Sequence, residues 1–218
     1  MKKLLIGVLL LGANSPGANA SQQASKVDES IIGTHWVKYQ PTSVEGTLTG
    51  CQLSYLAVYN DHVYRNSEIT AVNGSIWLAR VNNSFGLMLK IGLKSLAQTN
   101  SQFERPHFAF LKGSETDTSK STVADSDSDG GYKLYAYTLG DKATLSVLSD
   151  ILSGSKISIS FNRSKGGFDV NVPIDTQVVD SEYTNYSRVK RKLSNQSIEG
   201  FGKCAQNLIG SMVSDTTK

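Results

Sequence analysis

The sequence of 218 residues predicts an α+β protein: a mainly antiparallel β-sheet of meander or sandwich type, with a C-terminal helix packed on it and one further helix before the last hairpin. Three patterns predict this class. Several segments alternate strictly between apolar and polar residues. Turn-forming residues separate these segments at close spacing. Near the C-terminus, apolar residues recur instead at three- and four-residue intervals, as on one face of a helix.

The N-terminus has the pattern of a bacterial export signal. Two lysines precede an apolar run at 4–11, and the small residues Ala18 and Ala20 follow. We expect a signal peptide over 1–20 and a flexible polar leader over 21–33. The alternative is an uncleaved N-terminal anchor, although the run is shorter than the roughly 20 residues that span a bilayer. The sequence therefore predicts a periplasmic or secreted protein with no transmembrane segment after cleavage.

Cleavage after residue 20 removes two lysines from a chain of net charge +3, which leaves 198 residues with a charge of +1. A nearly neutral protein has no electrostatic preference for nucleic acid, so we expect no nucleic-acid partner. This length suits one β-rich domain, expected over 34–213, followed by a short tail over 214–218.

The only two cysteines are Cys51 and Cys204, and both fall on predicted apolar faces. In an exported protein, disulfides persist, so we expect these two residues to be bonded to each other. The alternatives are two buried free thiols or a redox pair, which is more usually written Cys-x-x-Cys.

We expect about eight strands, and turn residues separate most of them. Turns are predicted at 60–62, at Asn73-Gly74 and at Asn82-Asn83. A short strand ends at Pro41, and the strand at 47–59 is apolar enough on both faces to be covered on both sides. The strands before residue 140 are expected at 35–39, 47–59, 75–81, 85–93, 107–111 and 132–139.

A helix is expected at 141–153, because the Asp141 side chain can accept a hydrogen bond from a backbone N–H of the first turn and Gly154 can end the helix. A hairpin follows: apolar residues at 157, 159 and 161 and at 168, 170, 172 and 174 flank a turn rich in glycine. The last helix is expected at 197–213, with Cys204 in its apolar stripe.

The segment 113–131 is rich in Ser, Thr and Asp and predicts a mobile surface loop. Within it, Asp125, Asp127, Asp129 and Gly130 match the first half of a calcium-binding loop, in which alternate carboxylates converge on one ion. Position twelve of that pattern, normally a bidentate Glu, is Ala136. We therefore expect either a weak Ca²⁺ site or, in better agreement with the missing ligand, a solvated acidic loop without cofactor.

Two further groups of side chains are candidates for binding. The basic run Arg188, Lys190, Arg191 and Lys192 could contact an anionic partner or form a solvated linker. Four tyrosines share strand faces and would form either a recognition surface or part of the core, of which the core is favoured. These tyrosines are Tyr55, Tyr59, Tyr135 and Tyr137.

No catalytic constellation is evident. His35, His62 and His107 lie on separate segments without metal-type spacing, and the Ser153–Lys156 match to S-x-x-K falls where a helix ends. No family pattern is specific enough to name. The sequence favours a non-enzymatic exported binding protein with a protein partner, such as an accessory part of a cell-envelope or secretion assembly. The alternatives are an inhibitor or immunity-type protein that uses the 113–131 segment as a wedge, and a small hydrolase whose site forms only in the fold.

Overall fold

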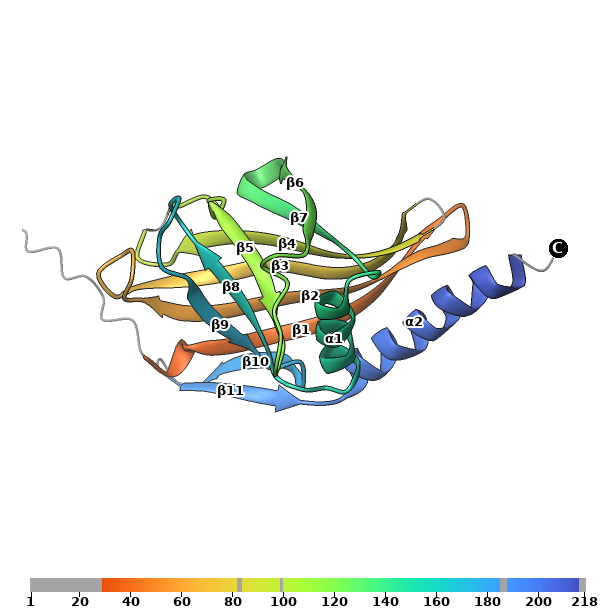
Figure 1. Ribbon diagram of the computed structural model, residues 1–218. Helices are drawn as coiled ribbons and strands as arrows, with labels where there is room; N and C mark the ends of the chain where they lie inside the picture. Colours follow the sequence, from red (N-terminus) through yellow and green to blue (C-terminus); the bar gives the residue numbers. More distant parts are fainter. Residues whose placement is uncertain (1–28, 82–83, 99, 185–187, 216–218) are drawn as a thin grey trace, which may run out of the picture.

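The computed structural model describes residues 29–81, 84–98, 100–184 and 188–215, and its strands form three antiparallel sheets (Figure 1). The six-stranded sheet has the order β1-β2-β3-β4-β7-β6, with bounds Gly33–Val44, Thr47–Asp61, Glu68–Val81, Ser84–Ser95, Tyr132–Thr138 and Thr122–Ser128 respectively. The three-stranded sheet has the order β5-β8-β9, with bounds Phe108–Lys112, Ile157–Asn162 and Val170–Ile174. A third sheet pairs β10 (Val178–Thr184) with β11 (Arg188–Leu193).

Two α-helices and two 3₁₀ turns complete the described fold. Helix α1 spans Lys142–Leu152, and helix α2 spans Gln196–Asp215. The 3₁₀ turns are η1 (Glu29–Ile31) and η2 (Asp129–Gly131). The predicted class, a mainly antiparallel α+β fold with a C-terminal helix, is confirmed. Among the residues described, no helix is long and apolar enough to cross a membrane. The predicted signal peptide, most of the leader and residues 216–218 lie outside the described residues.

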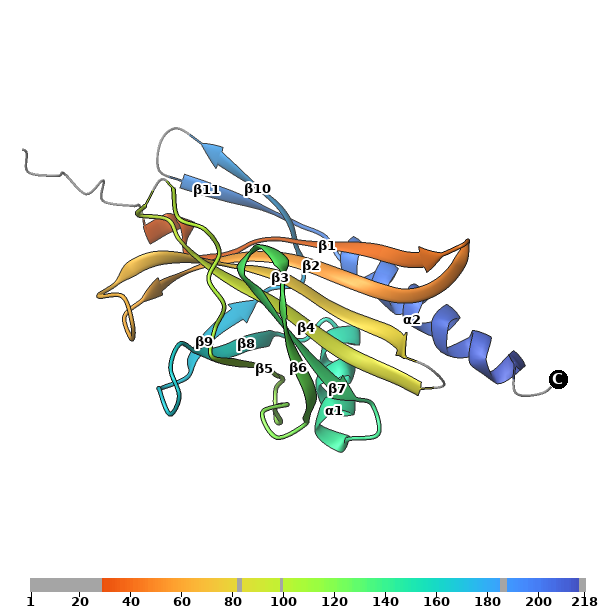
Figure 2. The same ribbon diagram turned by 90° about the horizontal axis from the view of Figure 1, so that it is seen from above.

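The main core lies between one face of the six-stranded sheet, here called the inner face, and the three-stranded sheet together with both helices (Figure 2). Strict alternation produces this face, because every second residue of a strand points to the same side. On β2, for example, Cys51, Leu53 and Tyr55 are at most 1 % exposed, whereas Gln52 and Ser54 are partly exposed. Helix α1 contributes Val147 and Ile151, and α2 contributes Phe201 and Leu208.

The disulfide between Cys51 and Cys204 is confirmed, and it joins the inner face of β2 to the buried side of α2. Each cysteine sits in the apolar stripe that the sequence analysis assigned to it. A bond across 153 residues of chain thus ties the last helix to the second strand.

The four tyrosines are buried, as favoured by the sequence, and their hydroxyls connect elements of the fold. Tyr135 and Tyr137 donate from β7 to the carbonyl oxygens of His107 and Ala109, which joins the six-stranded sheet to β5. Tyr55 donates to the Lys90 carbonyl oxygen at 2.8 Å. Burial raises the pKa of each of these phenols above 10.

The raised pKa values predict a loss of stability at alkaline pH. A phenol whose pKa is higher in the folded state contributes stability that is complete below about pH 10 and is lost as the pH rises above it. Each of Tyr55, Tyr135 and Tyr137 should therefore cost about 1.4 kcal/mol per pH unit above pH 10. Urea unfolding midpoints at pH 8, 10 and 11 test this. Phenolate absorbance at 295 nm that saturates while the circular dichroism stays native would contradict it.

The predicted turn at Asn73-Gly74 is wrong, because β3 runs through it without interruption. The Asn73 side-chain amide donates to the Tyr55 carbonyl oxygen at 2.9 Å, and its side-chain oxygen accepts from the Tyr132 hydroxyl at 2.8 Å. Asn73 therefore connects the middle of β3 to β2 and to β7. Gly74 lies directly across from Tyr55, whose ring passes over it to reach Lys90 on the next strand. The glycine is needed for this close approach and not for a chain reversal.

Gly74→Ala should lower the free energy of unfolding by about 1–3 kcal/mol, the usual cost of overpacking a core. A Cβ at this position would overlap the Lys90 carbonyl oxygen and lie 2.7 Å from the Tyr55 hydroxyl oxygen. Gly202→Ala on α2 is the matched control, since a Cβ there meets no atom within 4 Å and should stabilise the helix by about 0.5–1 kcal/mol. Equal urea midpoints for the two variants would refute the steric account.

Four further sequence predictions need correction. The first strand does not end at Pro41, because β1 stays paired with β2 as far as Val44. The segment 113–131 is not wholly a loop, because β6 forms within it and pairs with β7. Residues 178–193, where no strand was predicted, form the β10–β11 hairpin. Phe168 was placed on the buried face of the β8–β9 hairpin but is 84 % exposed, since β9 begins only at Val170. Eleven strands are thus described, where about eight were expected.

Candidate functional site

The opposite face of the six-stranded sheet, here called the outer face, carries both tryptophans of the chain. The helices and the three-stranded sheet pack against the inner face. On the outer side, Ile31 of η1 packs on a small apolar cluster at one end, and Phe103 from the connection between β4 and β5 lies over Gly92. Most outer-face side chains are therefore partly or fully exposed. On β1 to β4 they include Trp36, Lys38, Gln40, Gln52, Ser54, Leu56, Asn73, Trp77, Met88, Lys90 and Lys94, whereas Ser75 on the same face is buried.

A pocket of about 260 Å³ lies at the centre of the outer face. Trp36 forms one rim, and Tyr132 with Lys90 forms the other. Between the rims the floor is made of neutral hydrogen-bonding groups from β2 and β3, namely Gln52, Ser54, Asn73, Gly74 and Ser75. An aromatic rim over a floor of amides and hydroxyls suits a polar ligand with an apolar face.

The floor and one rim are held in position by hydrogen bonds. Asn73 connects the Tyr55 backbone to the Tyr132 hydroxyl, and Gln52 donates to the Ser54 hydroxyl at 2.8 Å. Gly92 lets two rings approach the sheet, because a Cβ there would lie 2.9 Å from Tyr132 and 3.1 Å from Phe103. The centroids of these two rings are 4.9 Å apart. Burial raises the pKa of Tyr132, which keeps its hydroxyl a donor.

Three aromatic rings on this side of the sheet each have a lysine ammonium over them. Nζ to ring-centroid distances are 5.4 Å for Lys38 and Trp36, 4.8 Å for Lys90 and Tyr132, and 5.9 Å for Lys94 and Phe103. The outward positions described on β1 to β4 hold these three lysines and no acidic side chain. The outer face is therefore positively charged although the protein as a whole is close to neutral.

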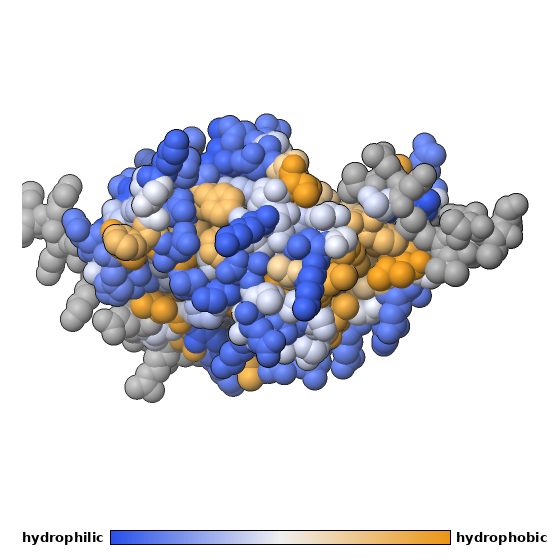
Figure 3. Space-filling view, viewed as in Figure 1, coloured by the Kyte–Doolittle hydropathy of each residue, from blue (hydrophilic) through white to orange (hydrophobic). Residues whose placement is uncertain are grey.

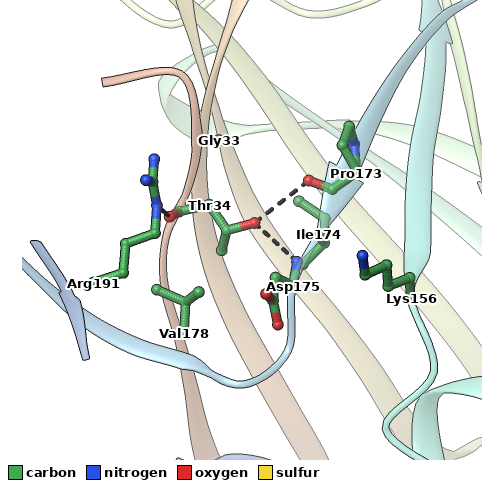
Figure 4. Close-up of a pocket in the computed structure, with 8 residues that line it drawn as sticks. All are labelled: Gly33, Thr34, Lys156, Pro173, Ile174, Asp175, Val178 and Arg191. Carbon is green, nitrogen blue, oxygen red and sulfur yellow. Dashed lines mark hydrogen bonds between the residues drawn. The ribbon is translucent and has the colours of Figure 1, made fainter. Parts of the chain in front are cut away.

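A second pocket of about 260 Å³ lies where the start of β1, the end of β9 and the β10–β11 hairpin meet (Figure 4). Its polar groups are largely used within the fold. Thr34 donates its hydroxyl to the Pro173 carbonyl oxygen and accepts from the Asp175 amide, and Arg191 donates to the carbonyl oxygens of Thr34 and Ile32. These bonds dock the hairpin onto the free edge of β1, so the pocket is better explained as a structural joint.

A third pocket, of about 370 Å³, continues from the outer face past the edge of β1. Lys38 lines it together with Lys192 and the first residues of α2, Gln196 and Ser197. Asp180 also lines it and pairs with Lys192 across the hairpin. This pocket shares with the outer face the lysine that covers Trp36.

Apolar residues are also exposed on the side of the molecule shown in Figure 3, where the ends of β1 and β2 lie above α2. Among the described side chains, Leu145 of α1 is 49 % exposed and Ile209 of α2 is 42 % exposed. Polar side chains lie between these apolar ones (Figure 3).

The predicted acidic and basic groups are engaged in the sheet. Asp125 forms an ion pair with Lys133 at 2.6 Å, and Asp127 forms one with Arg105 at 2.8 Å. Asp129 begins the 3₁₀ turn at the tip of the hairpin. No cluster that could hold a metal ion is found in the described part of the chain. Weak or absent Ca²⁺ binding stays a prediction, testable by melting with millimolar Ca²⁺.

The basic run forms β11. Lys190 and Lys192 lie across from Glu182 and Asp180 in the β10–β11 register, and Arg191 is used for docking the hairpin. The side chain of Arg188 lies outside the described ones. These positions are better suited to stabilising the hairpin than to contacting a partner.

No protein-family model matches the chain, and no curated protein and no solved structure matches it.

The sequence analysis did not single out the tryptophans. Trp77 stands between Ile76 and Leu78, which are both buried, so its outward direction could have been inferred from the alternation of β3. The strand predicted around Trp36, 35–39, is too short for its alternation to show which side of the sheet the Trp36 side chain faces. The two tryptophans share one face because of the register between β1, β2 and β3. Strand register cannot be read from the sequence.

Proposed function

We propose that this protein is exported and works by binding a component of the bacterial cell envelope through its outer face. The observation that carries the proposal is the placement of both tryptophans on the outer face, outside the core, where Trp36 lines a pocket with a polar floor. Tryptophan is costly to leave in contact with water and is frequent at binding sites, where its large surface and its N–H group both contribute. The disulfide between Cys51 and Cys204 supports an oxidising compartment.

A comparison of matched variants tests the proposal. The mature protein, Trp36→Ala and Phe168→Ala are immobilised and exposed to an envelope extract of the encoding organism. Phe168 is the control, because its ring is 84 % exposed on the β8–β9 connection and belongs to another surface. We expect the wild type and Phe168→Ala to retain the same component and Trp36→Ala to lose most of it. Retention that Trp36→Ala leaves unchanged would refute the outer face as the site.

A second candidate, an inhibitor that inserts a wedge into another protein, is favoured by one feature. The hairpin of β6 and β7 projects from the body of the molecule and ends in the turn Asp129–Gly131 (Figure 1). A deletion of this segment would disturb the core, because Thr118 is fully buried and its hydroxyl accepts from the Leu111 amide. Asp129→Lys changes the tip alone, and loss of the captured component in this variant would support the wedge.

The hydrolase alternative gains no support from the pockets. The described pocket on the outer face is lined by no carboxylate. The pocket at the hairpin joint is lined by one, Asp175, and the pocket at the edge of β1 is lined by one, Asp180. General acid–base hydrolysis usually needs two such groups on one substrate.

A further inference from the structure

We infer that the ligand of the outer face is an acidic polysaccharide whose sugar units carry carboxylates, a polyuronate. This inference rests on the proposed function and names the ligand of the same site. It starts from a repeated element: an aromatic ring with an ammonium group over it occurs three times on this face, as Trp36 with Lys38, Tyr132 with Lys90 and Phe103 with Lys94.

Each part of this element matches one part of a uronic acid unit. The face of an aromatic ring is electron-rich and attracts the weakly positive C–H groups on the flat side of a sugar. A lysine is a compact point charge on a flexible stem and can turn from the ring to a neighbouring carboxylate. The hydroxyls of the sugar are then left for the amide and hydroxyl groups of the floor, Gln52, Ser54 and Ser75.

The lysines of this face are not neutralised within the protein. Among the described residues, Lys38, Lys90 and Lys94 take part in no ion pair. A fourth ring–lysine pair in the fold, Lys133 with Tyr135, differs in this respect, because Asp125 lies 2.6 Å from its ammonium. Only the three outer-face pairs therefore keep a positive charge available to a ligand.

The three pairs are spread across the sheet in a way that suits a chain of sugars. Trp36 stands on β1, and Lys90 and Lys94 stand on β4, three strands away. With neighbouring strands 4.7–4.9 Å apart, the pairs span roughly 14 Å, which is the length of a short oligosaccharide. The pocket of about 260 Å³ lies between them.

Other anionic ligands fit less well. Phosphate groups are most often held by arginine forks or by backbone amides at a helix start, and the outward positions of β1 to β4 hold no arginine. A nucleic acid would need a longer series of cations than three lysines on a nearly neutral protein. An acidic protein would bury an apolar centre, whereas the centre of this face is polar.

Tryptophan fluorescence measures binding directly, because both tryptophans of the chain lie on this face. The probe is a hexamer of galacturonic acid, titrated alongside a neutral galactose hexamer and a twelve-nucleotide oligothymidine, with calorimetry as a second readout. We expect the acidic hexamer to bind, the neutral hexamer to bind at least tenfold more weakly, and added salt to weaken the binding of the acidic one.

Two triple variants locate the site. The variant with Lys38→Gln, Lys90→Gln and Lys94→Gln should bind the acidic hexamer at least tenfold more weakly. Its control is the variant with Lys112→Gln, Lys120→Gln and Lys142→Gln, which removes the same charge from exposed positions elsewhere and should bind as the wild type does. Equal melting temperatures of the two variants show that the fold is intact.

The inference is overturned if the acidic hexamer gives neither heat nor a fluorescence change at millimolar concentration, if the neutral hexamer binds equally well, or if oligothymidine binds more tightly. It is also overturned if both triple variants bind alike. In any of these cases the proposed function still stands when Trp36→Ala loses the component captured from envelope extract. The proposed function fails by itself when that component is retained.

Discussion

Replacing both Cys51 and Cys204 with alanine is expected to lower the free energy of unfolding by as much as about 5 kcal/mol. The bond closes a loop of 153 residues, and in the chain-entropy model a loop of this length restricts the unfolded state by about that amount. The folded contacts of α2 change little, because Phe201 and Leu208 keep their buried positions. A clear fall in the urea midpoint, with the native circular dichroism retained, is the expected result.

The same variant should also release α2 locally. This helix packs on β1 and β2, with which the disulfide is its only covalent connection apart from the chain itself. Amide hydrogen exchange in 197–210 should therefore accelerate more than exchange in β3 or β4. Reduced wild-type protein is the control and should match the double variant. An unchanged midpoint would mean that strain in the native state cancels the entropic gain.

Most strands that sequence analysis predicted have one buried and one exposed face. β2, which was expected to be covered on both sides, leaves Gln52 and Ser54 of its outer face partly exposed. β4 alternates from Phe85 to Leu93 because its inner residues fill the core and its outer residues face water. The disulfide was predictable for the same reason, since both cysteines fall on apolar stripes.

The strands that sequence analysis did not predict, β6, β10 and β11, lack the alternation of one buried and one exposed face. β6 is an edge strand whose residues are nearly all exposed, and its carboxylates are held by Lys133 and Arg105. The β10–β11 hairpin is held by Arg191 at the free edge of β1, a contact across more than 150 residues. The pairing of β6 and of the β10–β11 hairpin does not depend on alternating apolar and polar residues. A search for period-two patterns therefore does not detect these strands.

The candidate site was only partly predictable. Alternation can place Trp77 on the outward side of its strand, but its neighbours Gln52 and Met88 follow from the registers of β2 and β4 with β3. Chain order also hides that Phe103, from the connection between β4 and β5, lies beside Tyr132. The face therefore becomes visible only once the strands are paired.

Arg163→Met should destabilise the protein by about 3–5 kcal/mol, because it leaves the carboxylate of Asp61 buried without its cation. Asp61 is fully buried at the end of β2, and its Oδ2 accepts from Arg163 Nε at 3.1 Å and from the Tyr59 hydroxyl at 2.9 Å. Its Oδ1 accepts from the Tyr64 amide at 2.9 Å. Arg163 follows β8, so this pair connects the two packed sheets.

The double variant Asp61→Asn with Arg163→Met should recover part of this loss, since it removes the buried charge together with its partner. Arg105→Met is the matched control, because Arg105 and Asp127 form an ion pair whose side chains are 44 % and 62 % exposed. Removing an exposed pair costs only about 0–1 kcal/mol. Urea midpoints of the four proteins decide the matter. If Arg163→Met cost no more than Arg105→Met, water would have to reach Asp61, and the connection between the sheets would rest on apolar packing alone.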